Sequence, residues 1–228
     1  MLNIFSWNNK SLIDATTLQQ ILDELLTPRL ERLGLAKAID YLWYEPTLKE
    51  IRQGFSYTLL KGATGTFTWG VKLDFIPMVS SGKVVYHKSA KKYVHHLFEW
   101  TDEYASSFNG GQLAGGVTTH FGLQEGRKSI ATLFERYEQK IISWFDTASS
   151  IENLIGIAER QVSIGKHYDI HHPRPKYVLA FLYAKAKQLD KATKLFDSLN
   201  DYEFDNNKAV KEKLKVKLLM LSAEKNGT

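Results

Sequence analysis

The feature that most constrains the fold of this chain is a regular alternation of side chains between residues 66 and 75. Large apolar side chains occupy every second position: Phe67, Trp69, Val71, Leu73 and Phe75. Small or polar residues occupy the positions between them: Thr66, Thr68, Gly70, Lys72 and Asp74. Because successive side chains of a β-strand point to opposite faces, the pattern predicts a strand with one apolar face. We expect helices to cover that face and solvent to cover the other.

Neighbouring segments supply the partners that such a strand needs. Residues 54–60, GFSYTLL, repeat the alternation, and the connector KGATG that follows them contains two glycines able to adopt positive φ. We therefore expect residues 54–60 and 66–77 to form an antiparallel hairpin. The segments KVVYHK at 83–88 and DYLWYE at 40–45 are predicted to be a third and a fourth strand.

Helical spacing of apolar residues precedes this sheet. It predicts a helix over residues 16–32, with Thr16 or Thr17 as the N-terminal cap. Pro28 lies inside this segment and predicts a kink or a junction between two helices. After the strands, the apolar spacing of residues 91–103 is closer to that of a helix than to that of a strand.

The second half of the chain is predicted to be helical. Periodic apolar residues indicate a helix over 124–146, a further helix that ends at Gly165, and three amphipathic helices after it. The order of the elements predicts an α+β fold, in which helices cover an antiparallel sheet of three to five strands. We divide the chain into an α+β domain, residues 1–147, and a helical region, residues 148–228, packed on the first.

Composition excludes several classes of site. The chain has no cysteine, which excludes disulfides, thiolate zinc sites, iron–sulfur clusters and a cysteine nucleophile. The N-terminal residues do not resemble a signal peptide, and no apolar run approaches the roughly 20 residues that cross a bilayer. We therefore expect a soluble, cytoplasmic protein that does not enter membranes.

The charge of the chain is mildly basic. Its 30 Lys and Arg residues exceed the 25 Asp and Glu residues by five. Weak nucleic-acid binding is thus one hypothesis. The lysines between 208 and 217 mostly fill the solvated side of an amphipathic helix, however, and this arrangement disfavours nucleic acid as the partner.

The segment IGKHYDIHHPRP, residues 164–175, gathers histidines and one carboxylate. His167, Asp169 and His171 could lie on one side of an extended segment and bind a metal ion. The two prolines push the residues before them out of the helical region, so the alternative is a polar connector between helices. We favour the connector and expect no bound metal.

Three other histidines are candidates for catalysis. His95 and His96 are adjacent, and His120 lies in the glycine-rich segment 109–122. A hydrolase-type site under this segment could combine His120 with His95 or His96. The chain has no phosphate-binding loop, no dinucleotide-binding fingerprint and no Gly-x-Ser-x-Gly elbow, so we expect no cofactor and favour a role without catalysis.

The C-terminal segment resembles a single tetratricopeptide-repeat hairpin. The repeat has a leucine, a small residue, a tyrosine, an alanine and a phenylalanine at fixed relative positions. This chain has the same residue types at those positions: Leu179, Ala180, Tyr183, Ala192 and Phe196. The resemblance covers about 35 residues, has Lys187 where the repeat has its turn glycine, and has no tandem second copy. Because a single repeat cannot bury its own faces, it implies a hairpin docked on the preceding helices.

The order of elements along the whole chain is similar to a group of mainly bacterial domains of unknown function. This resemblance implies the α+β architecture and carries over no catalytic residues. Our first hypothesis is accordingly a cytoplasmic protein that binds another protein through its helical hairpin or its exposed sheet face. Accessory roles, including that of an immunity protein, belong to this class.

Overall fold

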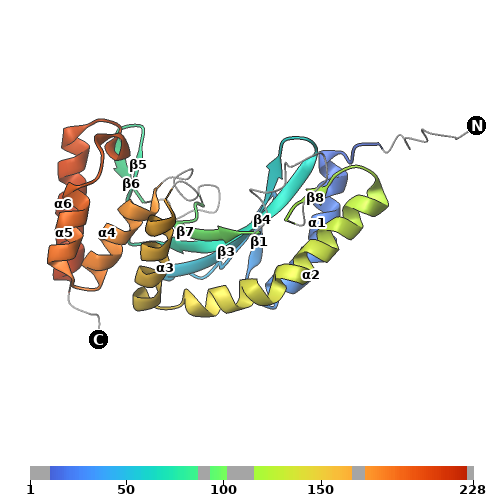
Figure 1. Cartoon of the computed structure of the whole chain (residues 1–228), viewed down its shortest axis with the longest axis horizontal. Coiled ribbons are helices and arrows are strands. Elements are labelled where there is room, and N and C mark those ends of the chain that lie inside the picture. Colours follow the sequence, from blue (N-terminus) through green and yellow to red (C-terminus); the bar gives the residue numbers. More distant parts are fainter. Residues whose placement is uncertain (1–10, 87–92, 102–115, 166–172, 225–228) are drawn as a thin grey trace, which may run out of the picture.

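A computed structural model describes residues 11–86, 93–101, 116–165 and 173–224 of the chain (Figure 1). It confirms a mixed α+β fold built on an antiparallel sheet, with helices in the C-terminal half. The helices are α1 (Ala15–Glu31), α2 (Leu123–Thr147), α3 (Ile151–Ile164), α4 (Pro175–Lys185), α5 (Leu189–Asp197), the 3₁₀ helix η3 (Asp201–Phe204) and α6 (Lys208–Ala223). The strands are β1 (Ala36–Ile39), β2 (Leu42–Tyr44), β3 (Ile51–Leu60), β4 (Thr64–Leu73), β5 (Met78–Ser80), β6 (Lys83–Val85), β7 (Leu97–Trp100) and β8 (Thr118–Thr119).

The predicted hairpin forms the centre of the main sheet. Strands β3 and β4 pair antiparallel over their whole length, from Ile51 opposite Leu73 to Leu60 opposite Thr64. The sheet order is β1-β2-β3-β4-β7, and β8 pairs with the start of β4. The predicted strand at 40–45 is β2 of this sheet. The predicted strand at 83–88 is shorter, and as β6 it pairs with β5 in a separate two-stranded sheet.

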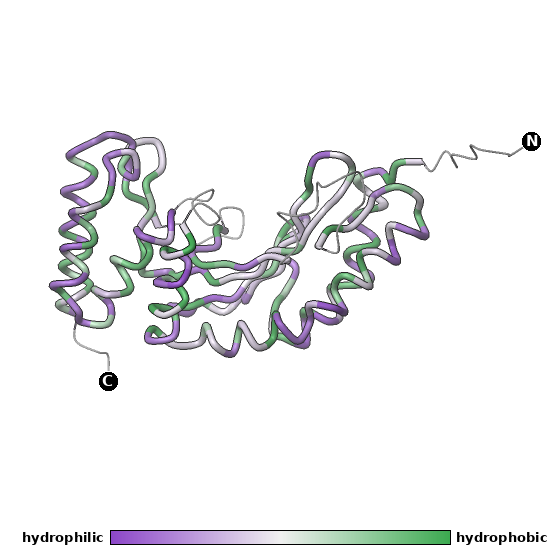
Figure 2. Tube along the Cα trace, in the orientation of Figure 1, coloured by the Kyte–Doolittle hydropathy of each residue, from purple (hydrophilic) through white to green (hydrophobic). Residues whose placement is uncertain are grey.

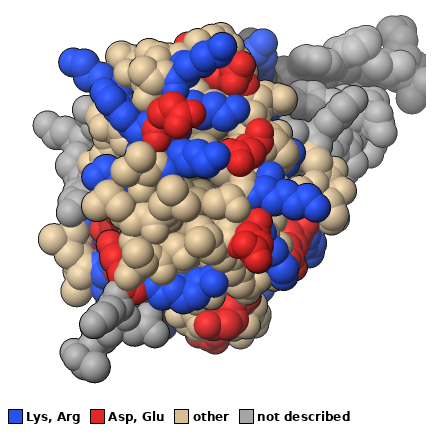
Figure 3. Space-filling model, turned by 90° about the vertical axis from the view of Figure 1, so that its left-hand side faces the viewer, with Lys and Arg blue, Asp and Glu red and all other residues tan. Residues whose placement is uncertain are grey.

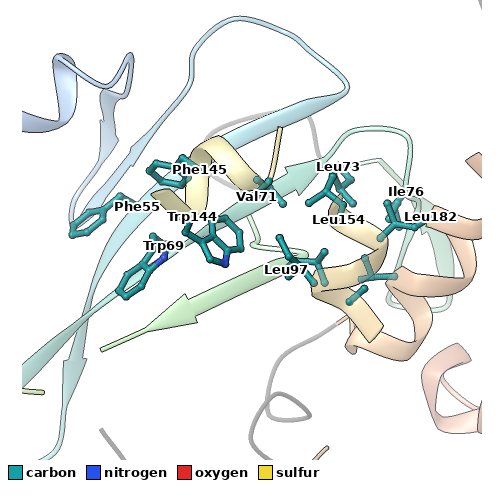
Figure 4. Packing of buried hydrophobic residues seen from close by; sticks show 14 of the residues in the cluster. Phe55, Trp69, Val71, Leu73, Ile76, Leu97, Trp144, Phe145, Leu154 and Leu182 are labelled. Carbon is teal, nitrogen blue, oxygen red and sulfur yellow. The ribbon is translucent and has the colours of Figure 1, made fainter. Parts of the chain in front are cut away.

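Helices α1 and α2 cover the apolar face of the sheet (Figure 1). Figure 4 shows Trp144 and Phe145 of α2 beside Trp69 and Phe55 of the strands. Green and purple residues alternate along α2 in Figure 2, as an amphipathic helix requires. The period-two pattern therefore identified the face that builds the core.

The second face of the sheet is buried along β4, so the expectation that solvent covers it there is wrong. Thr66, Thr68 and Lys72 are all buried, and only Asp74 keeps partial exposure. The reason is the segment just before β7, whose side chains Tyr93 and His95 pack on this face. Strand β4 is thus covered on both sides, and the hydroxyls of Thr66 and Thr68 form hydrogen bonds within the protein.

The predicted helix over 91–103 is also wrong, because residues 97–100 form β7. This strand pairs antiparallel with β4, with Thr68 opposite Trp100 and Val71 opposite Leu97. The edge of β4 would otherwise leave a row of backbone N–H and C=O groups without partners. Pairing with β7 satisfies them, and this long-range gain outweighs the weak helical spacing of the segment.

The first helix differs from its prediction in its cap and in its continuity. Asp14 is the N-cap, and its carboxylate accepts a hydrogen bond from the Thr17 N–H at 2.9 Å. Pro28 lies inside one uninterrupted helix. Helix α3 ends at Gly165, as predicted, with φ +71°, and its N-cap is Ser150.

The C-terminal helices continue the same hydrophobic core. Helix α4 is buried from Tyr177 to Ala184 because α3, α5 and α6 pack around it. The Tyr177 hydroxyl donates to the Pro77 carbonyl at 2.7 Å and joins α4 to the segment after β4. Helices α4 and α5 form the expected hairpin, with Ala192 and Phe196 buried. Within the described ranges, no helix is long and apolar enough to cross a membrane.

Candidate functional site

The histidines predicted as catalytic candidates lie far apart along β4. The His120 N–H donates to the Ala63 carbonyl just before this strand, whereas His96 Nδ1 accepts from the Leu73 N–H at its end. Ten residues separate these two anchor points, which corresponds to about 33 Å of strand. His95 packs at Gly70, seven residues or about 23 Å from Ala63. The structure therefore does not bring His120 together with His95 or His96.

His120 belongs to a buried hydrogen-bonded cluster. Its Nε2 atom lies 2.7 Å from the Tyr57 hydroxyl, which also bonds to the Thr118 hydroxyl. Burial raises the pKa of Tyr57 well above its usual range and lowers the pKa of His120. Both side chains are thus neutral near pH 7. All three residues are buried, and the cluster joins β8 to β3.

The predicted metal ligands lie outside the described residues. This holds for His167, Asp169 and His171, and also for positions 109–115 of the glycine-rich segment. Among the described residues, no group of three or more His, Asp or Glu side chains could hold a metal ion. The metal hypothesis therefore stays a sequence prediction.

His95 lies beside a cavity on the second face of the sheet, which we call the sheet pocket. The cavity measures about 490 Å³. Its lining comes from the β1–β2 turn, β2, β3, β4, the segment before β7, and β7: Asp40, Tyr41, Leu42, Ser56, Tyr57, Thr58, Thr68, Tyr93, Val94, His95 and Phe98. Ser56 Oγ lies 3.4 Å from His95 Nε2, and the Thr58 and Thr68 hydroxyls are 3.3 Å apart.

Two opposed glycines position the aromatic wall of the sheet pocket. Gly54 of β3 pairs with Gly70 of β4. A Cβ atom at Gly54 would lie 2.2 Å from the Tyr93 hydroxyl, and one at Gly70 would lie 2.8 Å from His95 Nδ1. Tyr93 and His95 also contact each other edge to face, with ring centroids 5.0 Å apart. Only glycine at both positions leaves room for the two rings on the sheet.

Buried cations lie beside Tyr93. Arg52 and Lys72 are 1% and 2% exposed, and both approach the Asp74 carboxylate, at 2.7 and 3.6 Å. The Lys72 ammonium also lies 6.0 Å from the centre of the Tyr93 ring. Burial raises the pKa of the Tyr93 hydroxyl, which stays protonated and donates to the Arg52 carbonyl at 3.4 Å. This arrangement holds Tyr93 in place.

A second candidate lies on the outer side of α6. Its inner side carries the predicted apolar stripe of Val210, Leu214, Leu218 and Leu221, which is buried. Val216, Leu219 and Met220 point away from that stripe and are 54%, 41% and 55% exposed. Their spacing of three and four residues places them side by side on the helix. We call these three residues and the lysines 213 and 217 around them the C-terminal surface.

A groove continues the C-terminal surface toward the sheet. Its volume is about 450 Å³. Apolar side chains from four parts of the chain line it: Leu48, Phe75, Tyr86, Met220 and Leu221. Charged residues complete the lining: Lys49, Glu50, Asp74, Lys217 and Glu224. Figure 3, which looks at this end of the molecule, shows a tan area with charged side chains around it. Sequence reasoning identified the lysines but missed the exposed apolar strip between them.

No protein-family model, curated protein sequence or solved structure matches the chain. The resemblance to a group of bacterial domains therefore stays a prediction from the sequence.

Proposed function

We propose that this protein is a non-enzymatic accessory protein that binds another protein through its C-terminal surface. The observation that carries the proposal is the exposure of Val216, Leu219 and Met220 on one side of α6. Large apolar side chains that lie together on the surface lose contact with water when a partner covers them. The partner that we propose is an acidic amphipathic helix.

The shape of the surface fits a helix. The three apolar residues follow i, i+3 and i+4 spacing, so they form a ridge along one turn of α6. The adjacent groove contains Tyr86 and Leu48, which are 41% and 70% exposed. A helix laid beside α6 could place one apolar side chain in the groove and pack others on the ridge. Covering each half-exposed side chain would contribute about 1 kcal/mol.

The charge of α6 favours an acidic partner. The helix carries five lysines and one glutamate, a net charge of +4. Lys211 and Lys215 pair with Asp201 and Asp197, whereas Lys213 and Lys217 form no ion pair within the described part of the chain. A second copy of the chain would present the same positive charge and be repelled. Glutamates beside the apolar stripe of a partner helix would complement the positive charge of α6.

The location that we propose for this interaction is the cytoplasm. The support is that a chain without cysteine forms no disulfides and so needs no oxidising compartment to fold. An accessory or immunity-type role requires binding of one macromolecular partner and no catalytic group. The separate positions of the histidines agree with such a role.

A synthetic peptide tests the proposal directly. It should form an amphipathic helix with leucines on one face and glutamates beside them, and a peptide with lysine in place of glutamate is its control. We expect the acidic peptide to bind with a dissociation constant on the order of 10 µM in fluorescence anisotropy. Met220→Glu should weaken binding at least about tenfold, whereas Leu59→Glu, at an exposed position on β3, should leave it unchanged.

Two outcomes would overturn the proposal. One is equal binding of the acidic peptide to the parent protein and to the Met220→Glu variant. The other is failure of the acidic peptide to bind while a random oligonucleotide binds with steep salt dependence, which would identify a nucleic-acid protein instead.

A further inference from the structure

We infer that the sheet pocket binds a small, planar, uncharged aromatic compound that carries a hydroxyl or amide group. This site is separate from the C-terminal surface and does not depend on the function proposed for it. Its residues come from β2, β3, β4 and β7 and from the segments beside them. The size, the lining and the rigidity of the cavity favour such a ligand.

The size and lining fit a ring system. A volume of about 490 Å³ lies within the range of pockets that hold small organic ligands. Tyr41, Tyr93 and Phe98 supply aromatic surface, on which a planar ligand can pack by offset or edge-to-face contacts. The strands add a row of hydroxyls from Ser56, Thr58 and Thr68. These groups can bond to the polar edge of the ligand.

The charge of the lining favours an uncharged compound. Among the described residues that line the cavity there is no lysine or arginine, and the single carboxylate is that of the exposed Asp40. A carboxylate or phosphate on the ligand would therefore lose its hydration without gaining a lysine or arginine from these residues. A hydroxyl or amide group on the ligand loses less hydration free energy when it enters the cavity, and it can form hydrogen bonds with the hydroxyls of the strands.

The wall of the sheet pocket is preorganised. The opposed glycines Gly54 and Gly70 fix Tyr93 and His95 on the sheet, so neither ring has to be ordered when a ligand binds. Thr58 is exposed, whereas Thr68, whose hydroxyl lies 3.3 Å from the Thr58 hydroxyl, is buried. The second face of the sheet is therefore open to solvent at Thr58, at the position where the pocket lies.

The conformation of Tyr41 supports a role for this turn in binding. Its φ angle is +61°, in the left-handed region that glycine and asparagine adopt with least strain. Tyrosine is an uncommon choice for a two-residue hairpin turn, where asparagine followed by glycine is preferred. Strained residues of this kind cluster at binding sites, since the rest of the fold must hold them in place. Tyr41 contributes an aromatic ring where a glycine would contribute none.

The experiment uses the full chain and two simple probes. Titration with 4-hydroxybenzamide, followed by ¹H–¹⁵N correlation spectra, should give saturable shifts at the amides of Ser56, Thr58 and Val94. A dissociation constant on the order of 1 mM is expected for a fragment of this size. Cyclohexanol, which is neither planar nor aromatic, should give no saturable shift.

Two variants of neighbouring positions make the test specific. Thr58→Phe places a ring inside the cavity and should weaken binding at least about tenfold. Leu59→Phe adds a similar ring at the next position of β3, which points to the opposite face, and should leave binding unchanged. Both positions are exposed, so neither variant should prevent folding.

Three results would overturn the inference. The first is absence of saturable shifts in the parent protein up to about 10 mM probe. The second is equal binding to the Thr58→Phe variant, and the third is equal binding of cyclohexanol.

Discussion

The Tyr57 hydroxyl lies 2.7 Å from His120 Nε2, inside a cluster that joins β3 to β8. His120 also forms a backbone bond to Ala63, and its carbonyl accepts from the Ile13 N–H. The imidazole thus stands where the N-terminal segment, the β3–β4 hairpin and β8 meet. Its protonation state affects the stability of all three.

Stability should therefore fall on acidification below about pH 6.5, the ordinary pKa of histidine. Burial lowers the pKa of His120 in the folded protein, so the unfolded chain binds the proton first. From about one pH unit above 6.5, His120 is neutral in both the folded and the unfolded state and adds no pH dependence. Below pH 6.5 the contribution of neutral His120 to the free energy of unfolding is lost as pH falls through the folded-state pKa. The slope is at most about 1.4 kcal/mol per pH unit.

Urea unfolding at a series of pH values checks this expectation. His120→Gln keeps a side chain that can bond to Tyr57 but cannot titrate in this range. Its stability profile should be flatter than that of the parent protein between pH 6.5 and 5. Parallel profiles of the two proteins would show that His120 does not titrate differently on folding.

Two glycine-to-alanine substitutions should change the stability of the protein in opposite directions. A Cβ atom at Gly70 would lie 2.3 Å from the Leu97 carbonyl oxygen, so β7 would have to move away from β4. We expect Gly70→Ala to destabilise the protein by about 2 kcal/mol. A Cβ atom at Gly156 would meet nothing within 4 Å, and this position lies on the exposed side of α3. Gly156→Ala should stabilise the protein by about 1 kcal/mol.

Thermal unfolding distinguishes the two changes, because about 1 kcal/mol corresponds to roughly 2–4 °C in Tm for a chain of this size. The Tm should fall for Gly70→Ala and rise for Gly156→Ala. A Gly70→Ala protein as stable as the parent would contradict the close approach of β4 and β7.

Asp74 should be necessary for the stability of the sheet beside Tyr93. Its carboxylate lies within 4 Å of both Arg52 and Lys72. Asp74→Asn would leave two buried cations close together with less compensation, at an expected cost of about 3 kcal/mol. Adding Lys72→Met should recover part of this loss, because it removes one buried charge.

Chemical denaturation of the single and double variants measures this coupling. Glu50→Gln is a matched control, since Glu50 pairs with Lys185 on the surface and should change stability by less than about 0.5 kcal/mol. Equal stabilities of the Asp74→Asn and Glu50→Gln proteins would contradict a structural role for the buried carboxylate.

The spacing of apolar residues predicted those helices and strands whose formation depends on residues close together in the chain. The β3–β4 hairpin followed from the alternation through Trp69, and the buried stripe of α6 followed from the spacing through Leu218. The cap of α1 was placed two or three residues late, because threonine is also a favourable N-cap residue and Thr16 and Thr17 follow Asp14 closely.

Contacts between distant segments were not predictable from the same patterns. The burial of Thr68 and Lys72 depends on Tyr93 and His95, which lie more than twenty residues later in the chain. Strand β7 is buried on both faces and so shows no alternation. The sheet pocket is built from such a long-range contact and from a strand without alternation. Among its residues, only His95 had been a candidate for a functional site. The exposed strip of α6 is apolar in sequence, but nothing local indicates that no helix covers it.

The central claim is that the C-terminal surface binds an acidic amphipathic helix. The most direct test is to map the acidic peptide on the ¹⁵N-labelled protein by chemical-shift changes. We expect the largest changes at Val216, Leu219, Met220 and Tyr86. They should disappear in the Met220→Glu variant and leave Thr58 unaffected. Changes centred on other elements, or none at saturating peptide, would contradict this claim.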